Sequence, residues 1–285
     1  MMRAYCILLL VVSFFACERG SDVPPSGTPQ ATTLAIASGK HRVGFDLASG
    51  GRLASYTLEG QELLQTKRDA NGWQWGSTVW TSPQAAWNWP PEATFDALPF
   101  AVVERSDNAI VLQSDTMSSS GLQLTKSFRF VSGGKGQYLE AEYRLYNHGQ
   151  DTVYRGVWEN TRLPYTGEYS VAVDSLRRDL IERPFRKRTQ YTVMEMTQDD
   201  HEKGKLFVHP GKGRATYTGN GLSFRKLWVN DPEEPVAPGQ APLEIYFAPE
   251  EGFTEFEIQG PYRAIAPGEY VNLVVAWKVS RLVAE

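Results

Sequence analysis

The sequence predicts an all-β protein whose strands are mostly antiparallel and whose helices are few and short. Strand-like segments with alternating apolar and polar residues recur from residue 34 onward, and turn residues such as Gly-Gly, Gly-Asn-Gly and Pro-Gly separate them. No segment keeps a helical period over three turns. Aromatic residues make up 12% of the chain, which favours strands. Many regularly spaced strands in 285 residues indicate one large sandwich or barrel domain.

The first 16 residues have the composition of a secretory signal peptide. A short positive start is followed by an apolar run from Ala4 to Phe15, which is too short to span a bilayer as a helix. Cys17 follows an alanine and resembles the lipidated cysteine of a bacterial lipobox, although Phe14 stands where that pattern usually has Leu. We therefore expect a lipoprotein signal peptide at 1–16 and a lipid on Cys17. The alternative is an ordinary signal peptide cleaved nearby.

Composition limits the partners and the compartment. Residues 17–35 are rich in Pro, Gly, Ser and Thr and read as a flexible tether, so the domain is expected at 36–285. Cys6 would leave with the signal peptide, so the mature domain has no disulfide and no cysteine metal site. The net charge of −4 argues against nucleic acid. We expect a monomer in the bacterial cell envelope, periplasmic or at the outer membrane. Its only membrane attachment is the lipid, and it needs no metal or cofactor.

The expected strands succeed one another between residues 41 and 279. Residues 50–64 read as a strand, a Glu-Gly turn and a second strand, and 100–115 read as two short strands around a Ser-Asp-Asn turn. One short helix is expected at 174–182, DSLRRDLIE. The other strand candidates are 41–47, 122–131, 138–147, 152–163, 213–229, 242–248, 253–265 and 270–279.

Several stretches resemble the galactose-mutarotase-like (aldose epimerase-like) superfamily. GGRLASYTLEGQELL at 50–64 is similar to the opening hairpin of that fold, and FTEFEIQGPYRAIAPGEYVNLVVAWKV at 253–279 is similar to its end. GSTVWTSPQAAWNWPP at 76–91 and VWENTRLP at 157–164 resemble an uncharacterised branch of secreted bacterial proteins. The resemblance covers residues 36–280 and implies a β-supersandwich with a concave sheet that binds sugars.

Two carboxylates share one face of the strand FTEFEIQ. If this segment is extended, Glu255 and Glu257 alternate with apolar residues and point the same way. The resemblance places the general base of mutarotases at Glu257, because a Leu-Glu-Thr-Gln pattern matches residues 256–259. A partly buried carboxylate can take a proton near neutral pH. We expect Glu257 to be catalytic if the protein is an enzyme, and Glu255 to bind substrate. The alternative is a solvated strand face paired to a neighbouring Lys or Arg.

The acid of the mutarotase mechanism is not identified. The family motif His-any-Tyr-Phe-Asn is replaced here by Trp158-Glu159-Asn160-Thr161, and no histidine fills its first position. Glu159 or Arg162 could contact the ligand instead. Equally, these two residues could form a buried ion pair that fixes the sheet.

Five of the eight tryptophans lie in the Gly/Pro-punctuated segment 72–91. Indole rings match the flat C–H faces of sugars and carry an N–H donor. We expect Trp73 and Trp75 to cover the core, and one or two of Trp80, Trp87 and Trp89 to line a sugar cleft. Gln84 and Asn88 could add hydrogen bonds. The alternative is that the rings plug the open end of a sandwich.

Basic residues suggest further ligand contacts. The stretch RRDLIERPFRKR at 177–188 reads either as a solvated loop or as a rim that attracts an acidic sugar, since Arg binds carboxylates bidentately. Arg225 and Lys226 are adjacent and must face opposite ways in a strand. Of these two, Lys226 is expected to point inward or toward the cleft.

These observations predict a carbohydrate-binding envelope lipoprotein for a mono- or oligosaccharide that is neutral or acidic. It is either an aldose epimerase or mutarotase that uses a Glu base, or a non-catalytic carbohydrate-binding module that accompanies secreted glycanases. A structural envelope protein that docks a protein partner is the third alternative, because fold does not decide function.

Overall fold

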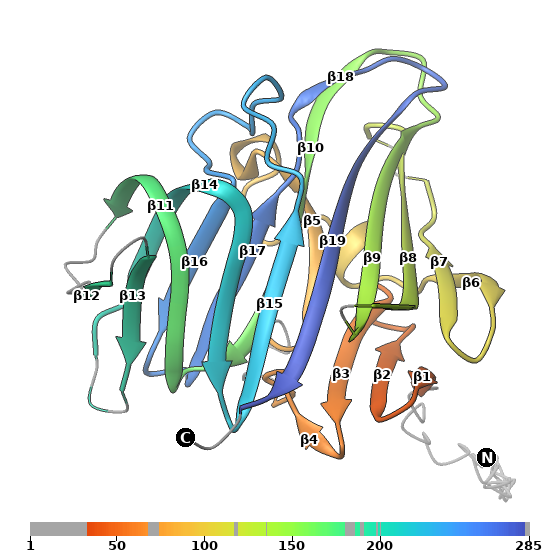
Figure 1. The fold of residues 1–285 in the computed structure, drawn as a ribbon. Coiled ribbons are helices and arrows are strands. Elements are labelled where there is room, and N and C mark those ends of the chain that lie inside the picture. Colours follow the sequence, from red (N-terminus) through yellow and green to blue (C-terminus); the bar gives the residue numbers. More distant parts are fainter. Residues whose placement is uncertain are drawn as a thin grey trace, which may run out of the picture. The chain divides into compact units, whose positions relative to one another are not determined.

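Two antiparallel sheets, joined at one edge, form the domain in the computed structural model (Figure 1). The structure describes residues 33–67, 74–116, 119–134, 136–179, 186–188, 191–197, 199 and 201–282. Apart from two short helices, η1 (Gln84–Ala86) and α1 (Ala93–Asp96), the regular elements of the described residues are strands. The expected all-β class and the antiparallel arrangement are confirmed.

The first sheet carries the two carboxylates singled out in the sequence. β5, β10, β17 and β16 are adjacent in it, so segments from the N-terminal, middle and C-terminal parts of the chain lie side by side. Its strands are β1 (Thr33–Ser38), β2 (His41–Asp46), β3 (Arg52–Leu58), β4 (Gln61–Glu62), β5 (Ser77–Ser82), β10 (Val153–Pro164), β17 (Phe253–Gln259) and β16 (Leu243–Ala248).

The second sheet combines consecutive strands, β6 to β9, with two strands from the C-terminal part of the chain. Its strands are β15 (Leu222–Trp228), β19 (Tyr270–Arg281), β9 (Gly136–Asn147), β8 (Leu122–Gly133), β7 (Ala109–Gln113) and β6 (Ala101–Arg105). A short strand, β18 (Arg263–Ile265), pairs with the beginning of β10.

The long strand β14 (Gly204–Gly219) joins the two sheets. Its residues 204–208 pair with β16 of the first sheet, and its residues 214–219 pair with β15 of the second. β11 (Gly167–Asp179) follows β14 along its whole length, with register shifts around Val173. β13 (Tyr191–Met196) and β12 (Arg186–Arg188) extend this edge.

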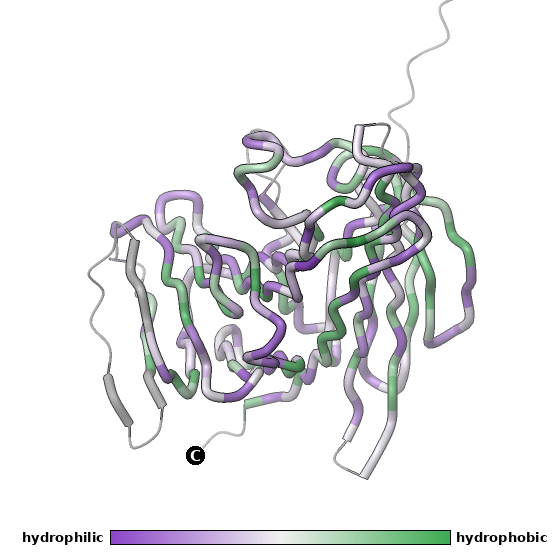
Figure 2. Tube along the Cα trace, turned by 90° about the horizontal axis from the view of Figure 1, so that it is seen from above, coloured by the Kyte–Doolittle hydropathy of each residue, from purple (hydrophilic) through white to green (hydrophobic). Residues whose placement is uncertain are grey.

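Rings from both sheets meet in the core between them. Phe45 of β2 lies 4.9 Å from Phe128 of β8, and Phe256 of β17 lies 5.7 Å from Phe224 of β15, between ring centroids. Tyr56 of β3 stacks on Trp277 of β19. The alternation that produces these inward rows is visible as alternating hydrophilic and hydrophobic residues along the strands in Figure 2.

The turn between β3 and β4 confirms one local prediction. Glu59 and Gly60 have φ values of 53° and 80°, which is the pair of positive φ angles that a two-residue hairpin of type I′ needs. Glycine adopts this conformation without steric cost.

One predicted element is wrong. The expected helix at 174–182 is extended where the structure describes it, because residues 173–179 of β11 pair with 205–210 of β14. Regular structure is also found within the residues expected to form the tether. β1 starts at Thr33, and Leu34 packs against the core. Three earlier predictions lie outside the described residues: the signal peptide, Cys17 and Trp73. Residues 180–185 of the basic stretch 177–188 also lie outside them.

Candidate functional site

A hollow of about 290 Å³, here called the aromatic cleft, lies on the first sheet. The register of neighbouring strands brings the polar side chains of the cleft together. Glu255 of β17 is opposite Arg162 of β10 on one side and Tyr246 of β16 on the other, and Tyr246 is opposite Lys205 of β14. The cleft is lined by Gln74, Trp80, Gln84, Trp89, Trp158, Lys205, Tyr246 and Glu255.

Indole rings form one wall of the cleft. Trp80 packs edge-to-face against Trp158 at 5.1 Å and against Trp89 at 5.9 Å, between ring centroids. Trp80 and Trp158 are buried, whereas Trp89 is 52% exposed at the rim. Trp87 does not line the cleft but supports it, because its ring contacts both Trp80 and Trp158.

Three of these indoles have already used their N–H donors inside the protein. Nε1 of Trp80 donates to Oδ1 of Asp96 at 2.9 Å, and Nε1 of Trp158 donates to Oε2 of Glu257 at 2.7 Å. Nε1 of Trp87 donates to the carbonyl of Thr81. Trp80 and Trp158 therefore offer apolar ring surface to a ligand, and hydrogen bonds must come from other side chains.

Glu255 is the carboxylate that lines the cleft. Its side chain is 8% exposed, and its Oε1 accepts a hydrogen bond from Nε of the buried Arg162 at 2.8 Å. Burial raises the pKa of Glu255; the Arg162 charge opposes this effect and the Glu257 charge adds to it. Arg162 also lies 4.9 Å from the centroid of Trp80, and its Nη1 and Nη2 have no hydrogen-bond partner among the described residues.

Glu257, the expected base, lies beneath the cleft and is fully buried. Its Oε2 accepts hydrogen bonds from Lys205 at 2.9 Å and from Trp158, both of which line the cleft above it. Burial raises the pKa of Glu257, although Lys205 opposes this. The alternative for β17 holds in part: its carboxylates are paired with Arg162 and Lys205, but its face is not solvated, since every residue of β17 is buried.

Lys205 is the cation at the cleft surface. Its side chain is 21% exposed and its Nζ forms ion pairs of 2.9 Å with both Glu244 and Glu257. Burial alone would lower the pKa of Lys205, but the two carboxylates outweigh it and raise that pKa. Nζ lies 4.9 Å from the centroid of Trp158. Lys205 thus remains protonated and covers the buried carboxylates.

The structure corrects the placement of Glu159 and Lys226. Glu159 follows Trp158 in β10 and so points to the opposite face, into the core between the sheets. There Nζ of Lys226 donates to Oε2 of Glu159 at 2.7 Å and to Thr161, and both charged side chains are fully buried. The prediction that Lys226 rather than Arg225 points inward is confirmed, but neither Glu159 nor Lys226 lines the cleft.

Sequence reasoning found four lining residues and missed four. Trp80, Gln84, Trp89 and Glu255 lie in the cleft as expected. Gln74, Trp158, Lys205 and Tyr246 were not predicted. None of the lining residues is a histidine, and the described residues hold no group of three or more His, Cys, Asp or Glu able to bind a metal.

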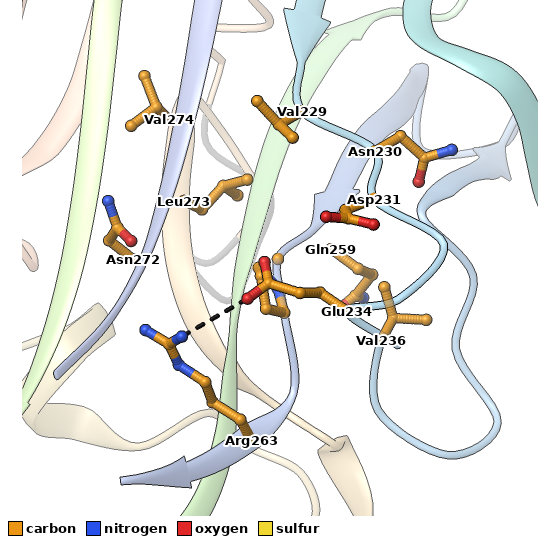
Figure 3. Close-up of a pocket in the computed structure, with 12 residues that line it drawn as sticks. Val229, Asn230, Asp231, Glu234, Val236, Gln259, Arg263, Asn272, Leu273 and Val274 are labelled. Atoms are coloured by element: carbon orange, nitrogen blue, oxygen red, sulfur yellow. Dashed lines mark ion pairs between the residues drawn. The ribbon is translucent and has the colours of Figure 1, made fainter.

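A second hollow of about 250 Å³ lies where the loop after β15 approaches β18 and β19 (Figure 3). Arg263 and Glu234 form an ion pair of 3.5 Å across it. Leu273 and the exposed Val229 and Val274 give it an apolar side. Asp231 adds a second carboxylate to the lining, but no aromatic residue lines this hollow, so the aromatic cleft is the stronger candidate site for an aromatic-stacked ligand.

Solved structures of low sequence identity share this architecture. A galactose mutarotase-like protein from Lactobacillus casei has a TM-score of 0.61 at 14% identity, and the match covers 87% of this chain and 100% of that one. A galactose mutarotase related enzyme from Lactobacillus acidophilus has a TM-score of 0.58 at 8% identity, with 89% and 99% covered. A galactose mutarotase-like protein from Clostridium acetobutylicum has a TM-score of 0.56 at 8% identity, with 88% and 95% covered. No curated protein has a matching sequence.

These likenesses define the class of protein. The chain has the galactose mutarotase-like β-sandwich fold, as the sequence resemblance predicted. Within that fold it belongs to the family described as Domain of unknown function (DUF4380), whose model matches residues 66–280. Among the described residues, no helix is long and apolar enough to cross a membrane.

Proposed function

We propose that the aromatic cleft binds a carbohydrate. The observation that carries this proposal is the combination of indole surface with a buried carboxylate, an ammonium group and an amide in one hollow. The C–H faces of a pyranose pack on aromatic rings, and its hydroxyl groups need donors and acceptors at the ring edge. Solved structures of the same fold carry names of sugar-converting proteins, which supports the same substrate class.

The division of roles follows from the hydrogen bonds. Because the N–H groups of Trp80 and Trp158 are engaged with Asp96 and Glu257, the ligand meets their ring surfaces. Glu255 accepts hydrogen bonds from sugar hydroxyls, and Gln84 and Lys205 can donate them. Trp89 at the exposed rim closes over the ligand from the solvent side.

A screen of mono- and oligosaccharides by thermal shift, followed by isothermal titration, tests the proposal. Trp89→Ala should weaken binding of the identified sugar roughly five- to tenfold, because one stacking contact is lost. It should leave the unfolding midpoint almost unchanged, since half of this side chain is exposed. Tyr154→Ala is the matched control, because Tyr154 is 57% exposed and does not line the cleft. If no sugar binds, or if both variants bind equally, the cleft is not the sugar site.

A second candidate function is epimerisation or mutarotation, favoured by the neighbouring carboxylates of β17. A base must remove the proton of the anomeric hydroxyl, and an acid must protonate the ring oxygen. The raised pKa values of Glu255 and Glu257 suit a base near neutral pH. Glu255 has direct access to the cleft, whereas Glu257 requires Trp158 and Lys205 to move. None of the lining residues is a histidine, and Lys205 is a poor acid because the two carboxylates raise its pKa, so the acid is not identified.

Anomer exchange measured by NMR separates the two candidates. Glu257→Gln should slow exchange about 100-fold if Glu257 is the base, and Glu255→Gln should do so if Glu255 is. If wild-type protein binds a sugar but does not accelerate its anomer exchange at any pH from about 5 to 9, the enzyme hypothesis is rejected and a non-catalytic binding module is favoured.

We further propose that the protein is anchored in the bacterial cell envelope through a lipid on Cys17. The sequence pattern of residues 1–17 supports this. Cys17→Ser should abolish incorporation of labelled palmitate and shift the protein out of the membrane fraction. Equal labelling of both proteins would contradict the anchor.

A further inference from the structure

The second hollow, drawn in Figure 3, is here called the loop hollow, because the loop after β15 forms one of its sides. It measures about 250 Å³, and none of its lining residues lines the aromatic cleft. Its lining combines hydrogen-bond donors, acceptors and apolar side chains. The lining residues that matter for its chemistry are Asp231, Glu234, Gln259, Arg263, Asn272 and Leu273.

Gln259, the last residue of β17, brings a buried and unused polar group to the loop hollow. Its side chain is only 3% exposed. One end of its amide lies 3.3 Å from the amide of Gln240, and the other end has no hydrogen-bond partner among the described residues. A buried polar group without a partner destabilises the fold. Because Gln259 lines the loop hollow, a ligand there can supply the missing partner.

The contacts of Gln240 show which end of the Gln259 amide is unused. Amide nitrogen and oxygen atoms are told apart by their hydrogen-bond partners. Gln240 meets the carboxylate of Glu244, which accepts hydrogen bonds, so its nitrogen lies there, 3.0 Å from Oε2. The same nitrogen is the atom that faces Gln259, so Gln259 turns its oxygen toward Gln240. The unused end of Gln259 is therefore an N–H donor, which needs an acceptor oxygen.

Acceptors face the same hollow. Oδ1 of Asp231 accepts from the backbone N–H of Glu233 at 2.9 Å, which leaves Oδ2 for a ligand. Nδ2 of Asn272 donates to Glu142 at 3.2 Å, which leaves its Oδ1. Glu234 and Arg263 are 3.5 Å apart, longer than an ordinary hydrogen bond, so a ligand hydroxyl can bind to both.

The charges of the lining argue against an ionic ligand. A phosphate or a carboxylate would lie against Asp231 and Glu234, and a metal ion would lie against Arg263. The charged residues that flank the lining also include both signs: Glu142, Glu233, Arg144 and Arg155. An uncharged ligand that both donates and accepts hydrogen bonds fits this balance.

The loop hollow also has an apolar side and a limited size. Leu273 is buried, while Val229 and Val274 are exposed beside it. These aliphatic groups can pack on the C–H face of a ring. Small-molecule pockets usually measure about 300–1,000 Å³, so a hollow slightly below this range suits a ligand of one ring.

We propose that the loop hollow binds one neutral sugar unit, as a second site separate from the aromatic cleft. Hydroxyl groups of the sugar donate to Asp231 and Glu234, and they accept from the Gln259 amide and the Arg263 guanidinium. The C–H face of the ring packs on the aliphatic side. This site does not depend on sugar binding in the aromatic cleft, because the two sites share no lining residue.

Titration of the full-length protein with glucose, galactose and mannose, followed by NMR, tests the proposal. Saturable shifts of the Gly260 backbone amide and the Gln259 side-chain amide are expected with at least one of these sugars. The indole N–H signals of Trp80 and Trp158 report separately on the aromatic cleft. Sugars that shift only the indole signals would overturn the second site and leave the proposed function intact, and shifts confined to Gly260 and Gln259 would do the reverse.

Leucine, calcium chloride and sodium phosphate are the probes for a zwitterionic, a cationic and an anionic ligand. None of them should give saturable shifts at Gly260. Saturation by one of them, with no response to any sugar, would overturn the proposal.

Two exposed positions allow matched substitutions. Arg263→Gln should weaken sugar binding about tenfold, because a charge-assisted hydrogen bond is lost. Arg129→Gln is its control, since it also removes an exposed ion pair but lies outside the lining. Asp231→Asn should weaken binding about fivefold, and Glu233→Gln, in the same loop but outside the lining, should not. Equal weakening by a variant and its control would contradict the site.

Gln259→Met tests the unused donor itself. Methionine keeps the length of the side chain and removes the amide, so sugar binding should weaken roughly fivefold. The NMR spectrum of this variant shows whether it folds, and the exposed variants decide the question if it does not. A folded Gln259→Met protein that binds the sugar as tightly as the wild type would overturn the role of Gln259.

Discussion

Asp96 fixes the aromatic cleft from below. Its Oδ1 accepts hydrogen bonds from Trp80, from Thr78 at 2.8 Å and from Nη2 of Arg52 at 2.9 Å. Burial alone would raise the pKa of Asp96, but the charges of Arg52 and Arg162 and the hydrogen bonds outweigh it and lower that pKa. One carboxylate at the end of α1 therefore sets the orientation of the central indole.

Asp96→Asn should destabilise the protein strongly. The amide can still accept from Trp80 and Thr78, but Arg52 is then left as a buried charge without its counter-ion, which costs roughly 3–5 kcal/mol. Thr78→Val removes one neutral donor and should cost about 1 kcal/mol. Urea unfolding monitored by tryptophan fluorescence measures both values. If the two substitutions cost the same, the Arg52–Asp96 ion pair is not what holds this site.

Residues lining the cleft were predicted where composition or alternation indicates them. They were missed where their position depends on strand pairing. A tryptophan-rich irregular segment pointed to Trp80 and Trp89, and alternation in β17 pointed to Glu255. Glu159 was wrongly expected in the cleft. Because Trp158 faces the cleft, its neighbour Glu159 in the same strand must face the other way. Lys205 and Tyr246 enter the cleft through pairings between β14, β16 and β17, which no local pattern reveals.

At the scale of elements, β17 shows why its carboxylates have raised pKa values. It lies between β10 and β16, and one of its faces packs on the core while the other is covered by Trp158 and Lys205. The sequence predicted the strand and its alternation, but not that its polar face would be covered. The same limit explains the wrong helix at 174–182. The local sequence pattern favoured a helix there, but these residues pair with β14 and therefore form a strand.

The first strand gives a test of the domain boundary. Thr33, Leu34 and Ala35 pair with residues 44–46 of β2, although the composition of 17–35 indicated a tether. A chain that begins at residue 31 should unfold cooperatively with full stability. A chain that begins at residue 36 should lose roughly 1–3 kcal/mol, because half of β1 and the apolar contact of Leu34 are removed. Equal denaturant midpoints for the two chains would place the boundary at 36 after all.

For the molecule as a whole, the sequence indicated one large β domain but not how its two sheets are connected. The connection is β14, which pairs with β16 at one end and with β15 at the other. The core between the sheets also encloses charged groups. Lys126 points inward from β8, is 1% exposed, and donates to the carbonyl of Gly50 at 2.6 Å while lying over the ring of Phe100.

Lys126 should make the stability of the whole domain depend on pH. Burial lowers the pKa of Lys126 from 10.5 to about 7, with the Asp96 charge opposing this and the Arg52 charge adding to it. Between about pH 7 and 10, the unfolded chain therefore binds a proton at this site that the folded protein does not, so the free energy of unfolding rises with pH. Each pH unit contributes about 1.4 kcal/mol, or on the order of 3 kcal/mol between about pH 7 and 9.5.

Comparison with Lys126→Met isolates this contribution, since buried Lys226 also has a lowered pKa, of about 8, and acts in the same direction in both proteins. Methionine keeps most of the side-chain volume and removes the charge. The variant should be more stable than the wild type near pH 7, and the difference should shrink as the pH rises toward 9.5. Urea unfolding at both pH values measures it. A difference that stays constant, or that grows with pH, would mean that Lys126 remains protonated in the fold, held by Gly50 and the ring of Phe100.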